Sequence, residues 1–164
     1  MQADRHFRID NRLLHGQVVQ FWIPHLEVDN LVIADDEVAA NHSMLAVYRM
    51  ALPERVALEV VGVAGLAAAL RRASEGATMA LLSDIHQAAR ALMSGVAIDR
   101  LTLGNVHSLP SRARVTDSVF LSVEEQTALC ALRRQGLAVE IQTFPGETLR
   151  LEVDDRGGSR WVKR

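Results

Sequence analysis

The sequence predicts an α/β protein built on an open, mostly parallel, twisted sheet of about seven strands with helices on both faces. Two observations predict this class. Short uninterrupted runs of apolar or β-branched residues, typical of strands buried on both faces, recur along the 164 residues. Longer segments with helical spacing separate most of these runs, as in right-handed crossovers between parallel strands. The predicted strands are Phe7–Ile9, Leu31–Ala34, Val56–Val63, Met79–Leu82, Leu101–Leu103, Val119–Leu121 and Val139–Thr143.

The segments between these strands carry the start and stop signals of helices. An apolar series at helical spacing runs from Met44 to Leu52, and Pro53 follows it as a stop signal. Asp84 is a predicted N-cap, with Gln87 in the first turn after it. These signals predict helices after the second and the fourth strand.

The last predicted helix has the clearest boundaries. Ser122 and Glu125 form a capping-box pattern at its start. Arg133 and Arg134 fall in its last turn, where positive charge is favoured by the helix dipole, and Gly136 follows as a stop signal. This helix therefore separates the sixth and the seventh predicted strand.

The chain is predicted to fold as a single domain over residues 1–164, because it contains no internal repeat, low-complexity segment or Gly/Ser-rich linker. Its last part, residues 146–164, differs in character. Apolar and polar residues alternate there around Asp155–Ser159, which is typical of a β-hairpin with one solvated face. A polar tail is the alternative for this segment.

Composition narrows the class of protein and the compartment. The chain is 49% hydrophobic and 23% charged, and its net charge of -2 gives no reason to expect nucleic acid or an anionic membrane as a partner. The single cysteine, Cys130, cannot form an internal disulfide and suits a reducing compartment. The polar first residues do not resemble a signal peptide, and no apolar stretch approaches the roughly 20 residues that span a bilayer. We therefore expect a cytoplasmic protein.

Polar side chains follow several predicted strands at the points where those strands end. Ligands of open α/β sheets bind outside the carboxyl ends of the strands, so these residues converge on one rim. The rim candidates outside the first loop are Asp36, Ser83 and Asn105. Caps and turns also fall at strand ends, so each of these residues has a purely structural alternative.

The first of these loops combines an arginine, a histidine and a glycine at a strand-to-helix turn. A helix that opens at Gly16 would present free N–H groups and its positive dipole end to an anion, and Arg12 adds a planar fork for two phosphate oxygens. A neutral imidazole at His15 could attack a phosphoryl donor, and the same loop would then stabilise the resulting dianion. The remaining candidates for phosphate binding in this loop are Asp10, Asn11, Leu14 and Gln17.

Metal and nucleotide chemistry leave no pattern in the sequence. It contains no His-x-x-x-His or Cys-x-x-Cys spacing for a metal ion. It also contains neither the Gly-x-x-x-x-Gly-Lys loop that holds ATP phosphates nor the Gly-x-Gly-x-x-Gly turn of dinucleotide-binding proteins. We therefore expect no metal and no cofactor.

The first loop also carries a resemblance to a known family. Residues 8–18 read Arg-Ile-Asp-Asn-Arg-Leu-Leu-His-Gly-Gln-Val and resemble the active-site segment of the IIB components of the mannose/fructose/sorbose family of sugar phosphotransferase systems. The resemblance covers residues 7–145 and includes Asp35–Ala39, Leu101–Asn105 and Asp117–Ser122. It implies an α/β fold with a mostly parallel sheet, in agreement with the strand pattern.

The resemblance further implies partners and residue roles. His15 would accept a phosphoryl group on Nδ1 from a histidine of a IIA domain, and Arg12 would support the phosphate. The group would then pass to a sugar bound by the membrane components IIC and IID, so the protein would associate peripherally with the transporter. The identity of the sugar and the formation of a homo-oligomer stay open.

The sequence departs from the family pattern at three places. The family commonly has a second acid where Asn11 stands and Asn-Asp where Asp35-Asp36 stands, and Gly-Gly is frequent where this chain has Gly104-Asn105. None of these departures affects the predicted nucleophile. They bear on sugar specificity and on how partners dock.

Two other functions remain as alternatives. A regulatory module that is phosphorylated without a direct role in transport would carry the same site residues. A small hydrolase would use His15 as a general base together with Asp10 or Asp36.

Two adjacent leucines make a separate prediction about docking. Leu13 and Leu14 cannot both face water cheaply in a rigid loop, so we expect at least one of them to anchor the loop in the core. The other is either buried as well or exposed to contact the IIA domain.

Overall fold

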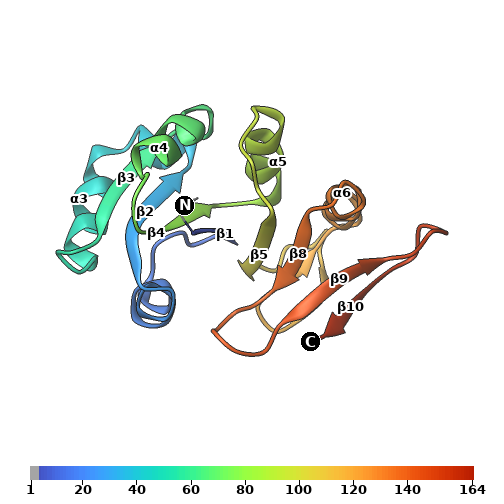
Figure 1. Ribbon diagram of the computed structural model, residues 1–164. Helices are drawn as coiled ribbons and strands as arrows, with labels where there is room; N and C mark the ends of the chain where they lie inside the picture. The colour runs from blue at the N-terminus through green and yellow to red at the C-terminus, as the bar shows by residue number, and fades with distance from the viewer. Residues whose placement is uncertain (1–3) are drawn as a thin grey trace.

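Strand β1 (Arg5–Asp10) lies inside an eight-stranded sheet in the computed structural model, which describes residues 4–164 (Figure 1). The strand order is β10-β9-β8-β5-β1-β4-β2-β3. The six strands from β8 to β3 are parallel, and β9 and β10 are antiparallel to their neighbours. The other strands of the sheet are β2 (Val28–Ala34), β3 (Ala57–Val61), β4 (Ala77–Leu82), β5 (Arg100–Asn105), β8 (Ala138–Ile141), β9 (Leu149–Val153) and β10 (Ser159–Lys163). The predicted fold class is therefore confirmed.

Helices cover both faces of this sheet. The 3-10 turn η2 and helices α4, α5 and α6 pack against one hydrophobic cluster, whereas the π-helix η1, α1, α2 and α3 pack against a second one. Their bounds are η1 (Val18–Trp22), α1 (Ile23–His25), α2 (Asp36–Ala39), α3 (His42–Ala51), η2 (Val63–Gly65), α4 (Leu66–Arg72), α5 (Ile85–Met93) and α6 (Val123–Arg134).

The predicted helix boundaries are confirmed where the sequence signals are strongest. The Asp84 carboxylate accepts a hydrogen bond from the backbone N–H of Gln87 at the start of α5. Ser122 and Glu125 form a capping box at the start of α6. Helix α3 ends at Ala51, ahead of Pro53. Local sequence chemistry thus sets the ends of the helices that support the sheet.

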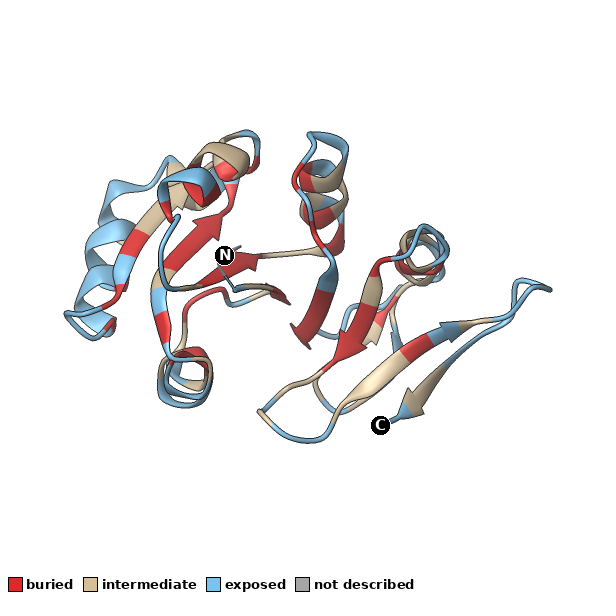
Figure 2. Ribbon diagram, in the orientation of Figure 1, coloured by how far each residue is buried: buried red, intermediate tan, exposed pale blue. Residues whose placement is uncertain are grey.

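Strand β1 separates two hydrophobic clusters. Its residues Phe7 and Ile9 face the larger cluster, which contains the buried side chains of α4, α5 and α6. The smaller cluster lies around Trp22, Leu31 and Met79 on the opposite face and contains no β1 residue. The central strands are buried along most of their length (Figure 2).

One predicted strand does not join the main sheet. Val119–Leu121 was expected in the parallel sheet, but Phe120–Leu121 forms β7, which pairs antiparallel with β6 (Ala113–Arg114) in a separate two-stranded sheet. The segment between β5 and β7 contains no helix that could serve as a crossover, and both edges of β5 are already paired, with β1 and with β8. The apolar run is instead buried beside the end of β5, where Val106 and Val119 form an isolated bridge.

The C-terminal segment forms the predicted hairpin rather than a polar tail. Strands β9 and β10 pair antiparallel, and β9 extends the sheet beyond β8. Leu151 is fully buried, and the Arg150 guanidinium lies 2.8 Å from the buried carboxylate of Glu140 across the strand pair. The hairpin is therefore packed into the main sheet. Of the helices within residues 4–164, none is long and apolar enough to cross a membrane.

Candidate active site

The loop after β1 lies at the point where the strand order reverses. β1 has β4 on one side and β5 on the other, so the chain leaves β1 between the carboxyl ends of two neighbouring strands. Asn11 joins all three: its Nδ2 donates to the Ser83 carbonyl at 2.6 Å, and its Oδ1 accepts from the N–H of His107 at 2.6 Å. Such switch points are the usual ligand sites of open α/β sheets.

The loop itself is anchored by its leucines. The Leu13 N–H donates to the Asp10 carbonyl at 2.9 Å, and Leu13 has a φ of 53°, in the left-handed region. Leu13 and Leu14 are 4% and 7% exposed, and both pack in the smaller cluster. Of the two alternatives for the second leucine, the structure therefore supports burial, and the predicted contact of the Leu14 side chain with a phosphate is not supported. Both leucines instead hold the backbone of residues 12–16 against the core.

A helix begins directly after His15. The segment is helical from Gly16 onward and continues through η1 and α1. The His15 carbonyl accepts the first hydrogen bond of this helix, from the N–H of Val19 at 3.1 Å. The N–H groups of the first turn have no intrahelical acceptor, as at any helix start, so they are available to an anion beside His15. The π-helical geometry of η1 is a local irregularity of the kind that recurs near functional sites.

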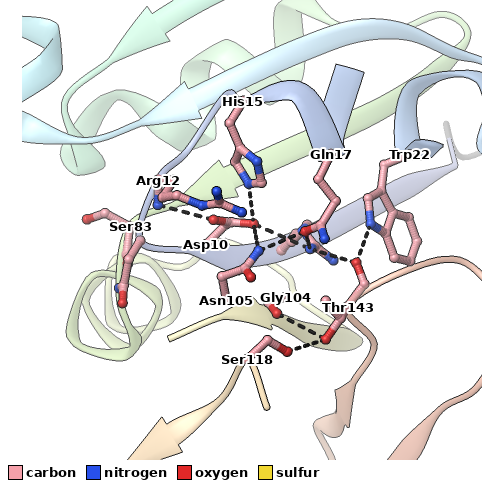
Figure 3. Close-up of polar contacts among 12 residues, drawn as sticks. Asp10, Arg12, His15, Gln17, Trp22, Ser83, Gly104, Asn105, Ser118 and Thr143 are labelled. Atoms are coloured by element: carbon pink, nitrogen blue, oxygen red, sulfur yellow. Dashed lines mark hydrogen bonds and ion pairs between the residues drawn. The ribbon is translucent and has the colours of Figure 1, made fainter. Parts of the chain in front are cut away.

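Among residues 4–164, the imidazole of His15 is held through one nitrogen, Nε2. Its Nε2 lies 2.9 Å from Oδ2 of Asp10, and the His15 side chain is 13% exposed (Figure 3). A carboxylate only accepts hydrogen bonds, so Nε2 carries the proton and the lone pair of the neutral ring is on Nδ1. This arrangement leaves Nδ1 as a nucleophile of defined orientation.

Asp10 is a buried carboxylate whose charge is stabilised from several directions. Its Oδ2 accepts from Nδ2 of Asn105 at 2.7 Å, and its Oδ1 accepts from the N–H of Arg12 at 3.1 Å. Burial alone would raise the pKa of Asp10. The hydrogen bonds from His15 and Asn105 and the charge of Arg8 outweigh that effect and lower the pKa below its usual value. Asp10 is therefore ionised at neutral pH.

Arg8 is the functional-site residue that the sequence analysis missed. Its side chain is fully buried, and its Nη2 lies 3.3 Å from Asp10 Oδ2 and 3.4 Å from Gln17 Oε1. Burial lowers the pKa of Arg8 to about 10, against the opposing effect of Asp10. The signal was a charged residue between Phe7 and Ile9, inside a strand otherwise read as apolar.

Arg12 lies at the surface of the same loop. Its side chain makes no hydrogen bond or ion pair within residues 4–164, so the guanidinium is available to a ligand. Its charge acts on Arg8, where it adds to the lowering of the pKa that burial causes. Figure 3 draws Arg12 beside Asp10 and on the same side as His15. The predicted pairing of His15 with an available arginine is thus present in one loop.

The other candidates divide into two groups. Gln17 and Asn105 belong to the network around Asp10, because Asn105 Nδ2 also donates to Gln17 Oε1 at 2.8 Å. Ser83 contributes its carbonyl to the Asn11 clamp. Asp36 is engaged elsewhere: its carboxylate accepts from the N–H of Val63 and pairs with Arg90, so it forms no contact with His15.

An open pocket of about 700 Å³ adjoins this network on the side of β8. Gln17 and Asn105 form part of its wall, together with Ser118 and Thr143, whose hydroxyl groups touch each other. Within residues 4–164, no three His, Cys, Asp or Glu side chains gather in a way that could hold a metal ion.

These features define a class of protein: an α/β protein with a histidine that a buried carboxylate orients beside a helix start able to bind an anion. Residues 5–154 match the family of PTS system sorbose subfamily IIB components, and the chain belongs to this family. IIB components of sugar phosphotransferase systems take a phosphoryl group from a IIA component and transfer it to a sugar during transport.

Individual relatives agree with this assignment. The fructose-specific EIIB component of Bacillus subtilis is 25% identical over 142 residues, which cover 85% of this chain and 87% of that protein. The mannose-specific EIIAB component of Escherichia coli is 26% identical over 137 residues, which cover 82% of this chain and 42% of that protein. The crystal structure of manxB from Thermoanaerobacter tengcongensis superposes with a TM-score of 0.78 and 32% identity, over 91% of this chain and 93% of that one.

Proposed function

We propose that His15 is the residue that carries the phosphoryl group, on Nδ1, between a IIA histidine and a sugar bound by the membrane components IIC and IID. The observation that carries this proposal is the hydrogen bond between Nε2 of His15 and the buried carboxylate of Asp10. It leaves Nδ1 as the one ring nitrogen with a free lone pair.

The first transfer is a displacement at phosphorus. The lone pair of Nδ1 attacks the phosphorus atom of the phosphohistidine on the IIA component, and the bond from phosphorus to the donor nitrogen breaks with its electron pair returning to the donor ring. The proton on Nε2 stays in place, so the phosphorylated ring of His15 becomes positively charged. Asp10 accepts from Nε2–H and stabilises that charge as it develops.

Arg12 and the helix start act on the phosphate itself. The guanidinium of Arg12 and the N–H groups that follow His15 stabilise the dianion once it is bound. In the second transfer a sugar hydroxyl attacks the phosphorus, and the bond to Nδ1 breaks with its electron pair returning to the ring. The proton that the hydroxyl loses passes to solvent, so His15 returns to its neutral form. The activity is that of a protein-Nπ-phosphohistidine–sugar phosphotransferase.

The partners follow from these two transfers. The carrier meets a IIA domain and the membrane components in turn, so we place it in the cytoplasm, at the inner side of the transporter. The mannose-specific EIIAB relative, whose name combines IIA and IIB, supports the link to a IIA donor. We assign the whole carrier to one domain, because strands from both halves of the sheet build the site.

The test is a phosphorylation assay with the cognate IIA component, phosphoenolpyruvate and the general phosphotransferase enzymes. We expect acid-labile label on the wild-type protein and on the control variant His42→Ala, whose histidine is exposed at the start of α3. His15→Ala should take up none. Label on His15→Ala would overturn the assignment.

A second arm separates transport from regulation. Phosphorylated protein added to vesicles that contain IIC and IID should yield sugar phosphate and unmodified His15. Loss of label only to water, with no sugar phosphate formed, would favour the regulatory alternative.

A further inference from the structure

A buried guanidinium lies behind the proposed phosphorylation site, on the side of Asp10 away from solvent. Arg8 is next but one to Asp10 in β1, so the two side chains point to the same face of the sheet. Its Nη1 donates to the Gln142 carbonyl at 2.8 Å, and its Nη2 lies 3.2 Å from the Thr143 carbonyl and 3.3 Å from Asp10 Oδ2. One side chain thus links the carboxylate of the site to the loop after β8.

The surroundings of Arg8 hold its guanidinium in one place. The Cζ atom lies 4.7 Å from the centroid of the Trp22 ring, a cation–π arrangement. Trp22 Nε1 in turn donates to the Thr143 carbonyl at 3.0 Å (Figure 3). Arg8 Nη2 donates to the same carbonyl, so both side chains hold one peptide group. The guanidinium is therefore fixed from the helix side as well as from the strand side.

Gly104 on the neighbouring strand leaves the space that the guanidinium occupies. A Cβ atom at this position would lie 1.9 Å from Nη2 and 2.0 Å from Cζ of Arg8. Such distances are far inside van der Waals contact, and the guanidinium is buried, so a side chain at position 104 would displace it. The position of the Arg8 guanidinium therefore depends on a glycine at position 104.

We propose that Arg8 is a positioning residue for phosphoryl transfer, which acts through Asp10 to keep the proton of His15 on Nε2 and the lone pair on Nδ1. Arg8 is the cation in direct contact with the Asp10 carboxylate on its buried side. Without it, a proton on Asp10 becomes less costly. A protonated Asp10 donates to Nε2 instead of accepting from it, which moves the ring proton to Nδ1 and removes the nucleophile.

The inference rests on the proposed function, but one of its readouts does not. The tautomer of unphosphorylated His15 can be measured by NMR on protein with ¹⁵N-labelled histidine, with no partner present. Suppose that the wild-type protein took up no phosphate, but that the His15 tautomer differed between the wild-type protein and the Arg8 variants. The proposed function would then fail, and the role of Arg8 in setting the tautomer would stand.

Three variants test Arg8 itself. Arg8→Met removes the charge, Arg8→Lys keeps a charge without the fork, and Gly104→Ala displaces the guanidinium with Arg8 still present. We expect each to mix the Nε2–H and Nδ1–H tautomers and to slow transfer from the IIA component at least about tenfold, as is common for residues that orient a reacting group. Rates are compared per folded molecule, with Leu129→Ala, in the opposite cluster, as a destabilised control.

A double variant separates positioning from general damage. If Gly104→Ala acts by displacing the guanidinium, it should cost nothing further when combined with Arg8→Met, because the group that it displaces is gone. Additive losses of transfer rate in the double variant would contradict the idea that Gly104→Ala acts through Arg8. Wild-type transfer rates in Arg8→Met, or slow transfer with the Nε2–H tautomer intact, would overturn the proposal.

Discussion

The two faces of strand β1 differ in almost every respect. Phe7 and Ile9 point into the larger hydrophobic cluster. His6, Arg8 and Asp10 alternate with them and point to the opposite face, where Arg8 and Asp10 are fully buried and His6 stacks on Trp22. One strand of six residues therefore serves the core with one face and the site with the other.

The buried charges on one face of β1 carry a cost in stability that the apolar face does not. Removing a charged side chain from water costs several kcal/mol per ion, and well-packed apolar residues usually give comparable or greater stability. Arg8 and Asp10 offset part of that cost by pairing with each other and with Asn105 and backbone carbonyls. Stability alone would not require buried charges on this face of β1, so their presence supports a role in the reaction.

On the charged face of β1, we expect the largest effect from Asp10→Asn. The amide can present N–H to Nε2 of His15, which moves the ring proton to Nδ1, and transfer should fall by about 10²- to 10⁴-fold, as for other histidines that lose their orienting carboxylate. Stability should also fall, by about 3 kcal/mol, because Arg8 stays buried without its ion partner. Transfer kinetics and urea unfolding measure the two effects.

The matched change on the apolar face is Ile9→Val, one position away. Ile9 is fully buried, and loss of one methylene should lower the free energy of unfolding by about 1 kcal/mol. Transfer per folded molecule should stay at the wild-type rate. A slow Ile9→Val protein would remove the distinction between the two faces.

A smaller effect is expected at the exposed side of the site, from Arg12→Lys. The charge is kept, but the planar fork that holds two phosphate oxygens is lost. Transfer should slow about tenfold, the equivalent of one charged hydrogen bond, with stability unchanged. Stopped-flow or quenched-flow transfer from the IIA component measures this, and an unchanged rate would exclude Arg12 from phosphate binding.

The two faces should also differ in their response to pH. Burial, together with the charges of Arg8 and Arg100, lowers the pKa of His6 to about 4 from 6.5. Between these two pH values, His6 therefore binds a proton in the unfolded chain but not in the folded one. The free energy of unfolding should fall as pH drops from 6.5 towards about 4.

His6→Phe keeps a ring against Trp22 without a titrating nitrogen. It should remove roughly 2 kcal/mol of that decline, which corresponds to most of the pKa shift after allowance for the partial exposure of His6. Unfolding curves at several pH values give the comparison. Parallel stability profiles for the two proteins would show that His6 is not the group responsible.

Sequence reasoning reached the fold and the loop because both have local signals. Capping residues such as Ser122 mark helix ends, and the run from Arg8 to Gln17 carries its own motif. The sequence did not predict the contacts between segments that lie far apart along the chain. Gly104 makes room for Arg8 only because β5 pairs with β1, and Asn105 meets Asp10 only across that same pair.

The same limit explains the two corrections. Val119–Leu121 has the composition of a central strand, but β5 is already paired on both edges, so the run pairs with β6 instead. Leu13 and Leu14 are adjacent, and only the left-handed conformation at Leu13 reveals how the bent loop accommodates both in the core.

The central claim is that Asp10 holds Nε2 of His15, so that Nδ1 bears the phosphate. The direct measurement is NMR of the phosphorylated protein with ¹⁵N-labelled histidine, which identifies the nitrogen bonded to phosphorus and the nitrogen that keeps its proton. The account predicts phosphorus on Nδ1 of His15 and a proton on Nε2. Phosphorus on Nε2, or on any other histidine, would contradict it.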